Sequence, residues 1–232
     1  MDTADVTTTA KERRFRLVGL GLIALAIAGL VTGCSSAART YQIGEGAPDS
    51  SGYDLAYAEG GGAEGIGVPT TMVEEWGFGC RQLFAGGRSG TAVLLQQPCG
   101  ENQQVFAVTG EFWELYRSAG DMAIVKYGFP VGSRGEWDQG STQGFGRGGA
   151  FSTFFMQRPG ERPYTLSVPM LEYYLSFDDR GVRFGYPTGE MSLTGNRLCQ
   201  EFEHAVITAT GAGDHFAFEV SLEGVAGRAP CS

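Results

Sequence analysis

Glutamine and tryptophan recur at fixed distances from three prolines, and their chemistry suits ligand recognition. Gln82, Gln143 and Gln200 each follow a proline at one identical interval, and Trp76 and Trp137 follow the first two prolines at a shorter identical interval. An aromatic face can stack on the C–H surface of a sugar, and an amide donates and accepts hydrogen bonds with hydroxyls. We predict that these five residues contact a carbohydrate. The alternative is that the tryptophans pack in the core and each glutamine caps its own turn.

Residues with the spacing of a catalytic centre are missing from the sequence. Ser141 in GSTQG (140–144) stands one place too early for the G-x-S-x-G motif of serine hydrolases. The adjacent carboxylates at 74–75 and 178–179 suit a solvated surface, since neighbours along a chain seldom face each other. His204 and His215 are isolated, and no C-x-x-C pair offers a zinc site. We predict a protein that is not an enzyme and that holds neither a metal nor a cofactor.

The prolines belong to a pattern that occurs three times. The motifs IGVP (66–69), YGFP (127–130) and FGYP (184–187) are each followed by a phenylalanine at the same interval after the proline. Tyr116 and Tyr173 precede the second and third proline at matching positions. Agreement at fixed spacing favours tandem repetition. The repeated motif residues are Pro69, Phe84, Pro130, Phe145, Pro187 and Phe202.

Each repeat predicts a short helix, a turn and a β-hairpin. The segments 110–120 and 168–181 have apolar residues on one helical face and end in glycine. The proline then favours a turn, and later runs such as TAVLLQQP are rich in strand-forming residues. We predict an α+β fold of three units of about 60 residues, near 53–109, 110–167 and 168–232. One such unit buries little apolar surface alone, so we expect the three to pack into one domain.

Four cysteines beyond the N-terminal segment indicate two disulfides. Cys80, Cys99, Cys199 and Cys231 allow three pairings, of which we favour the nearest neighbours, Cys80 with Cys99 and Cys199 with Cys231. Disulfides form in oxidising compartments outside the cytoplasm.

The N-terminus indicates export and a membrane anchor. A basic segment, 1–16, precedes an uncharged apolar segment, 17–33, and Cys34 follows in the sequence VTGC. This junction resembles a bacterial lipoprotein signal, in which the cysteine is lipidated and the preceding residues are removed. An uncleaved transmembrane helix is the alternative. In both cases residues 34–52 are expected to be a tether and 53–232 the folded domain, at the outer face of the cell membrane.

The composition argues against nucleic acid as a partner. The net charge is −9, and no basic patch stands out along the chain. An acidic surface repels a phosphate backbone.

The three motifs resemble the LGFP repeat family of actinobacterial cell-wall-associated proteins. The likeness covers roughly 53–220 and is strongest in the second unit, where YGFP is followed by QGF and the pair Gly148–Gly149. Ile66, Tyr127 and Phe184 replace the leading leucine of the family motif. The resemblance implies a module that binds or docks to a cell-wall polysaccharide such as arabinogalactan, or to peptidoglycan. The alternatives are an accessory lipoprotein that binds another envelope protein and, with less support, a cell-wall hydrolase.

The mass of the mature protein tests the anchor. If Cys34 is lipidated, the protein extracted from membranes lacks residues 1–33 and carries fatty acid, whereas an uncleaved helix leaves the full-length chain. Intact-mass spectrometry separates these two forms by kilodaltons, and a full-length mass would contradict lipidation at Cys34.

Overall fold

The computed structural model describes residues 39–147, 150–212, 215–222 and Cys231. Residues from Arg39 onward form one compact unit of mixed α+β structure with antiparallel sheets. The predicted basic segment, apolar segment and lipidation site at Cys34 lie outside the described residues. Within the described ranges, no helix is both long enough and apolar enough to cross a membrane.

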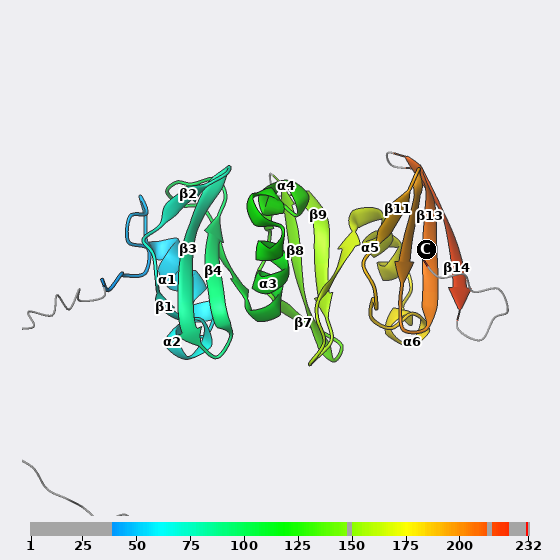
Figure 1. Cartoon of the computed structure of the whole chain (residues 1–232), viewed down its shortest axis with the longest axis horizontal. Coiled ribbons are helices and arrows are strands. Elements are labelled where there is room, and N and C mark those ends of the chain that lie inside the picture. The colour runs from blue at the N-terminus through cyan, green and yellow to red at the C-terminus, as the bar shows by residue number, and fades with distance from the viewer. Residues whose placement is uncertain (1–38, 148–149, 213–214, 223–230, 232) are drawn as a thin grey trace, which may run out of the picture. The chain divides into compact units, whose positions relative to one another are not determined.

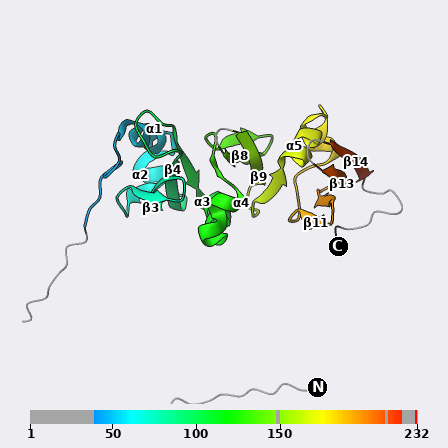
Figure 2. The same ribbon diagram turned by 90° about the horizontal axis from the view of Figure 1, so that it is seen from above.

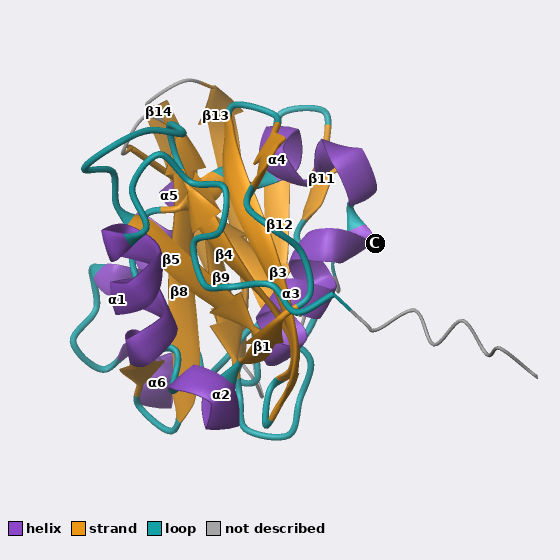
Figure 3. Cartoon of the chain, turned by 90° about the vertical axis from the view of Figure 1, so that its left-hand side faces the viewer, coloured by secondary structure: helices purple, strands orange, loops and turns teal. Residues whose placement is uncertain are grey.

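The first sheet has strand order β1-β3-β4-β5, with β2 paired to β3 (Figure 1). Helices α1 and α2 flank it and contact β5, β3 and β1 (Figure 3). These elements are α1 (Ser51–Glu59), α2 (Gly62–Gly65), β1 (Gly67–Pro69), β2 (Glu74–Trp76), β3 (Gly79–Gly87), β4 (Gly90–Gln96) and β5 (Val105–Thr109).

The second sheet has strand order β10-β9-β8-β6, with β7 paired to β8. Two short helices and a 3-10 turn precede it. These elements are α3 (Gly110–Ser118), η1 (Gly120–Met122), α4 (Ala123–Lys126), β6 (Phe129–Pro130), β7 (Gly135–Trp137), β8 (Gly140–Arg147), β9 (Ala150–Gln157) and β10 (Tyr164–Ser167).

The third sheet has strand order β11-β12-β13-β14. Its helices are α5 and α6, of which α5 contacts both β9 of the second sheet and β13 of the third. These elements are α5 (Val168–Leu175), α6 (Arg180–Arg183), β11 (Ser192–Thr194), β12 (Arg197–Glu201), β13 (Ala205–Ala212) and β14 (His215–Leu222).

Helices alternate with sheets, so that α3 and α5 each have a sheet on both sides. Figures 1 and 2 both show α3 between β4 and β8, and α5 between β9 and β13. One buried cluster accordingly joins Val93 and Leu95 of β4 with Phe112 of α3 and with Phe145 and Phe155 of the second sheet. Because these side chains come from neighbouring layers, burial of the first sheet depends on the helix that follows it.

The proline and the phenylalanine of each motif face each other across an antiparallel pair. Pro69 is opposite Phe84 and Pro130 is opposite Phe145, while Pro187 and Phe202 form an isolated bridge. All three phenylalanines are fully buried. The fixed interval between proline and phenylalanine therefore corresponds to the same contact in all three sheets.

A tyrosine hydroxyl donates to the glycine carbonyl two residues before each proline. The pairs are Tyr57 with Gly67 at 2.9 Å, Tyr116 with Gly128 at 2.5 Å and Tyr174 with Gly185 at 3.1 Å. The spacing before the prolines matches Tyr116 with Tyr173, but the residue that makes the equivalent hydrogen bond is Tyr174, one position later.

The two neighbouring tyrosines of α5 point to different places. Tyr173 stacks on Phe218 at 4.2 Å, while Tyr174 is buried. Burial raises the pKa of the Tyr174 hydroxyl to about 12, so it keeps its proton and remains a donor.

Both disulfides have the nearest-neighbour pairing. Cys80 is bonded to Cys99 and Cys199 to Cys231. The first ties β3 to the loop between β4 and β5, and the second attaches the C-terminal end of the chain to β12. The predicted pairing is confirmed.

Part of the predicted tether belongs to the compact unit. The Gly44 N–H donates to the Gln82 side chain at 2.8 Å, and the Val73 N–H donates to the Glu45 carbonyl at 2.6 Å. The sequence of this segment has no apolar periodicity, so its composition indicates a linker. Hydrogen bonds of its backbone nevertheless hold it against the first sheet. Of the predicted tether, 39–50 are thus held against the first sheet and 51–52 begin α1.

The glycine before each motif proline is a point where the fold should be sensitive. Gly128 has φ of +83°, and an added Cβ would lie 2.2 Å from the Gly146 carbonyl oxygen. We expect Gly128→Ala to lower the free energy of unfolding in urea by at least about 2 kcal/mol. Gly132→Ala is the control, because nothing lies within 4 Å of its added Cβ. Equal stability of the two variants would show that the turn tolerates another geometry.

Candidate functional site: a polar cleft at the β7–β8 hairpin

The three glutamines predicted to bind a ligand lie inside the fold. Gln82, Gln143 and Gln200 are at most 1% exposed. Each side-chain amide donates to the carbonyl two residues after the motif proline, which belongs to Thr71, Gly132 or Gly189.

A second amide contact distinguishes the first two glutamines. Gln82 also donates to the Gln42 carbonyl and Gln143 to the Ala107 carbonyl, at 2.7 and 2.9 Å. This geometry matches the alternative in which each glutamine caps its own turn. Because no amide group is left at the surface, we do not assign these residues to a binding site.

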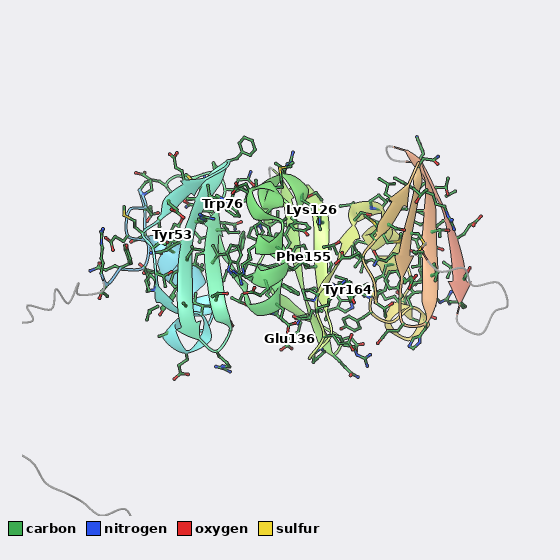
Figure 4. The ribbon with its side chains drawn as sticks, in the orientation of Figure 1. Tyr53, Trp76, Lys126, Glu136, Phe155 and Tyr164 are labelled. Carbon is green, nitrogen blue, oxygen red and sulfur yellow. A yellow bond between two sulfur atoms is a disulfide. The ribbon has the colours of Figure 1, made fainter. Side chains whose placement is uncertain are left out.

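The two tryptophans predicted to contact a ligand, Trp76 and Trp137, are half-buried between layers. Trp76 lies 5.8 Å from the Tyr116 ring of α3, with the Arg81 guanidinium over its face at 4.7 Å (Figure 4). Trp137 packs against the cluster around α5 and has the Arg180 guanidinium over its ring at 4.7 Å. Trp137 lines a cleft together with Arg180, whose guanidinium covers one face of the indole ring.

A cleft beside the β7–β8 hairpin has a volume of about 690 Å³. That size is typical of small-molecule sites. It is formed by the C-terminal end of α1, the end of β5, the β7–β8 hairpin and the loop after β9 (Figure 4 labels Glu136). The polar residues that line it include Glu59, Ser133, Arg134, Glu136, Asp138, Gln139, Ser141, Gln157 and Arg158.

Arg134 is held in place by contacts on several sides. Its guanidinium lies over the Phe112 ring at 4.4 Å and donates to the Gln157 Oε1 at 2.8 Å and to the Ser141 hydroxyl. Gln157 in turn donates to the Glu111 carboxylate and to the Glu161 carbonyl. Partial desolvation lowers the pKa of Arg134, while the charge of Glu111 raises it, so the group remains a cation at neutral pH. The cleft therefore contains an oriented hydrogen-bond donor.

The cleft exists because the second sheet is polar where the other two are largely apolar. Four residues after the motif proline, Arg134 stands where the first sheet has Val73 and the third has Met191, both packed in a core cluster. Farther along, Ser141 stands where the others have Cys80 and Leu198. Polar side chains replace the packing at this end of the second sheet.

Asp138 has a backbone conformation that usually favours glycine. It begins the two-residue loop of the β7–β8 hairpin with φ of +50°, whereas Gly77 and Gly195 occupy the same place in the other hairpins at +62° and +63°. A non-glycine residue at positive φ costs free energy and is often found at functional sites. The second hairpin thus carries a carboxylate, at a conformational cost, where the other two have no side chain.

Carboxylates outnumber guanidinium groups in the lining around Asp138. Its carboxylate contributes to a raised pKa of Tyr186, although burial of that phenol is the larger cause. Glu59 accepts from the Ser133 hydroxyl at 3.1 Å, and Arg158 is paired with Glu203. In the part of the chain that the structure describes, no group of acidic, histidine or cysteine side chains could hold a metal ion.

Sequence reasoning missed Arg134, Asp138 and Gln157. The sequence does carry a signal, because Arg134 and Asp138 differ in type from the residues at the same distances after Pro69 and Pro187. These candidate residues are found where the three motif segments differ, not where they agree.

Exchange of the hairpin residues tests whether Asp138 serves the fold. We expect Asp138→Gly to leave the free energy of unfolding unchanged or to raise it by up to about 1 kcal/mol, since the positive φ no longer carries a side chain. Gly195→Asp is the reciprocal variant in a spacious position and should lower it by about 1 kcal/mol. Thermal and urea unfolding measure both. A large loss for Asp138→Gly would assign the carboxylate a structural role.

Comparison with known proteins adds no family assignment. No protein-family model matches the chain. No curated protein matches it either.

Proposed function

We propose that this chain is a non-catalytic, membrane-anchored cell-envelope protein that binds cell-wall polysaccharide or peptidoglycan through the cleft at the β7–β8 hairpin. The observation that carries the proposal is the placement of Arg134 and Asp138 in one cleft. Both depart from the apolar or glycine residues at matching positions elsewhere in the chain. A strained carboxylate and an oriented guanidinium supply acceptors and donors for a polyhydroxylated ligand.

The proposal includes three tandem units of the LGFP repeat type. Its support is the recurrence of three contacts: proline opposite phenylalanine, tyrosine to the glycine carbonyl, and glutamine to the carbonyl two residues past the proline. On this view the first and third units frame the second, which carries the site. The N-terminal segment with Cys34 supplies the anchor, as the sequence predicts.

An envelope protein is the second candidate partner, and a specific surface favours it. Phe78, Met122 and Val125 are 70%, 59% and 50% exposed. Phe78 is in the β2–β3 loop, whose Gly77 lies against Ile124 of α4. Exposed apolar side chains on neighbouring elements often mark contacts with other proteins.

Sedimentation with purified wall polymer tests the proposal. The full-length protein in detergent should sediment with the polymer, and Asp138→Gly should reduce the bound fraction at least about tenfold, the loss typical of one charged hydrogen-bond partner. Glu75→Ala is the control. Glu75 precedes Trp76 in the first sheet as Glu136 precedes Trp137 in the second, but Glu75 does not line the cleft.

A variant of the exposed Phe78 tests the alternative binding surface in the same assay. If Phe78→Ser abolishes sedimentation while Asp138→Gly retains it, the cleft is not the site. If the wild-type protein stays in solution, polymer binding itself is contradicted.

A further inference from the structure

A second cleft adjoins the first on the other side of the β7–β8 hairpin. Its volume is about 590 Å³, and it is lined by Glu136, Trp137, Asp138, Gln139 and the segment 178–180, which ends at the first residue of α6. Glu136, Asp138 and Gln139 line both clefts. The hairpin is therefore accessible from two sides and exposes the same three polar side chains to each.

We propose that the two clefts bind one extended, uncharged glycan chain, which crosses the β7–β8 hairpin and contacts Glu59 and Gly60 at one end and 178–180 at the other. The inference rests on the proposed function and specifies its ligand. A single sugar or a chain terminus would occupy one cleft and leave the second without a role. A chain that spans both contacts residues from α1 to the α5–α6 segment, so its affinity grows with its length.

The walls of both clefts suit hydroxyl groups. Carboxylates accept hydrogen bonds from hydroxyls, while the Gln139 amide and the Arg134 guanidinium donate. Glu136, Asp138 and Asp178 are exposed to solvent, so a neutral chain can reach them without breaking a packed core.

The same carboxylates select against acidic glycans. Arg158 is engaged by Glu203, and the Arg180 guanidinium lies over Trp137 and donates to the Phe177 carbonyl at 2.9 Å. Arg134 also lines the first cleft, but the five carboxylates of the two clefts outnumber their three guanidinium groups; the carboxylates are Glu59, Glu136, Asp138, Asp178 and Asp179. Like charges repel, and repulsion at closely spaced sites is an effective source of specificity.

The first hairpin provides an internal comparison. At the corresponding places it has Gly77 and Phe78 in the loop and Met122 in the following segment, whereas the second has Asp138, Gln139 and Asp179. Neither cleft includes those residues of the first hairpin. The glycan path is thus specific to the second hairpin.

Titration calorimetry with defined oligosaccharides tests the inference. The probes are chitin oligosaccharides of two to six sugars, which are neutral, and galacturonic acid oligomers of the same lengths, which are acidic. For the full-length protein in detergent, the hexasaccharide should bind at least about tenfold more tightly than the disaccharide, because it reaches the second cleft. Acidic oligomers should bind at least about tenfold more weakly at every length.

Single-residue variants test where the glycan chain contacts the protein. Asp178→Asn should reduce the gain in affinity with chain length, because Asp178 lines the second cleft. Asp121→Asn is the matched control, since Asp121 and Asp178 stand at the same distance before a motif proline but only Asp178 lines a cleft. Asp138→Gly should weaken binding at every length.

The outcomes separate this inference from the proposed function. If the protein sediments with wall polymer and loses this in Asp138→Gly, but shows no dependence on oligosaccharide length, the proposed function holds and the two-cleft path is wrong. Equal binding of acidic and neutral oligomers would overturn the charge selection. Absence of oligosaccharide binding by a protein that sediments with the polymer would overturn the glycan assignment. If the protein binds neither the oligosaccharides nor the polymer, both proposals fail.

Discussion

The turn at each motif proline fixes the position of a helix relative to the strands that follow it. Its glycine has a positive φ in all three motifs, and an added Cβ would collide with the backbone of the neighbouring strand at Gly67 and Gly128 and with the Glu203 side chain at Gly185. A tyrosine from the preceding helix donates to the carbonyl of that glycine, and a glutamine from the following strand donates to a carbonyl after the proline. Buried carbonyls without donors would cost free energy. These two side chains therefore fix the helix and the hairpin to the same short segment.

The helices α3 and α5 are each fixed to the turn that follows them, and they also pack against the sheet that precedes them. Phe112 of α3 packs in the same cluster as Val93 and Leu95 of β4. Leu171 of α5 packs with Met156 of β9. Each layer thus buries apolar surface of its neighbour, and we expect stability to be shared between adjacent layers.

The sequence was informative wherever one contact recurs at one spacing, as for the proline–phenylalanine pairs and the disulfides. It was misleading where spacing varies, because Tyr57, Tyr116 and Tyr174 lie at three different distances before their prolines. The cleft could not be assembled from local patterns, since only the packing of successive layers places Glu59 and Arg134 in its walls. The role of the glutamines was equally hidden, because an amide that binds sugar and one that binds a carbonyl have the same sequence signature.

The third sheet explains why the tryptophan occurs only twice. Trp76 packs against Tyr116 of the helix that follows its sheet, and Trp137 is covered by Arg180 from the segment that follows its own. The corresponding residue in the third sheet is Thr194, which is exposed, and the described residues contain no helix after this sheet. Among the described residues, a large aromatic side chain at this position would have no following helix on which to bury its surface. The contrast with Thr194 favours a role for Trp76 and Trp137 in packing between adjacent layers.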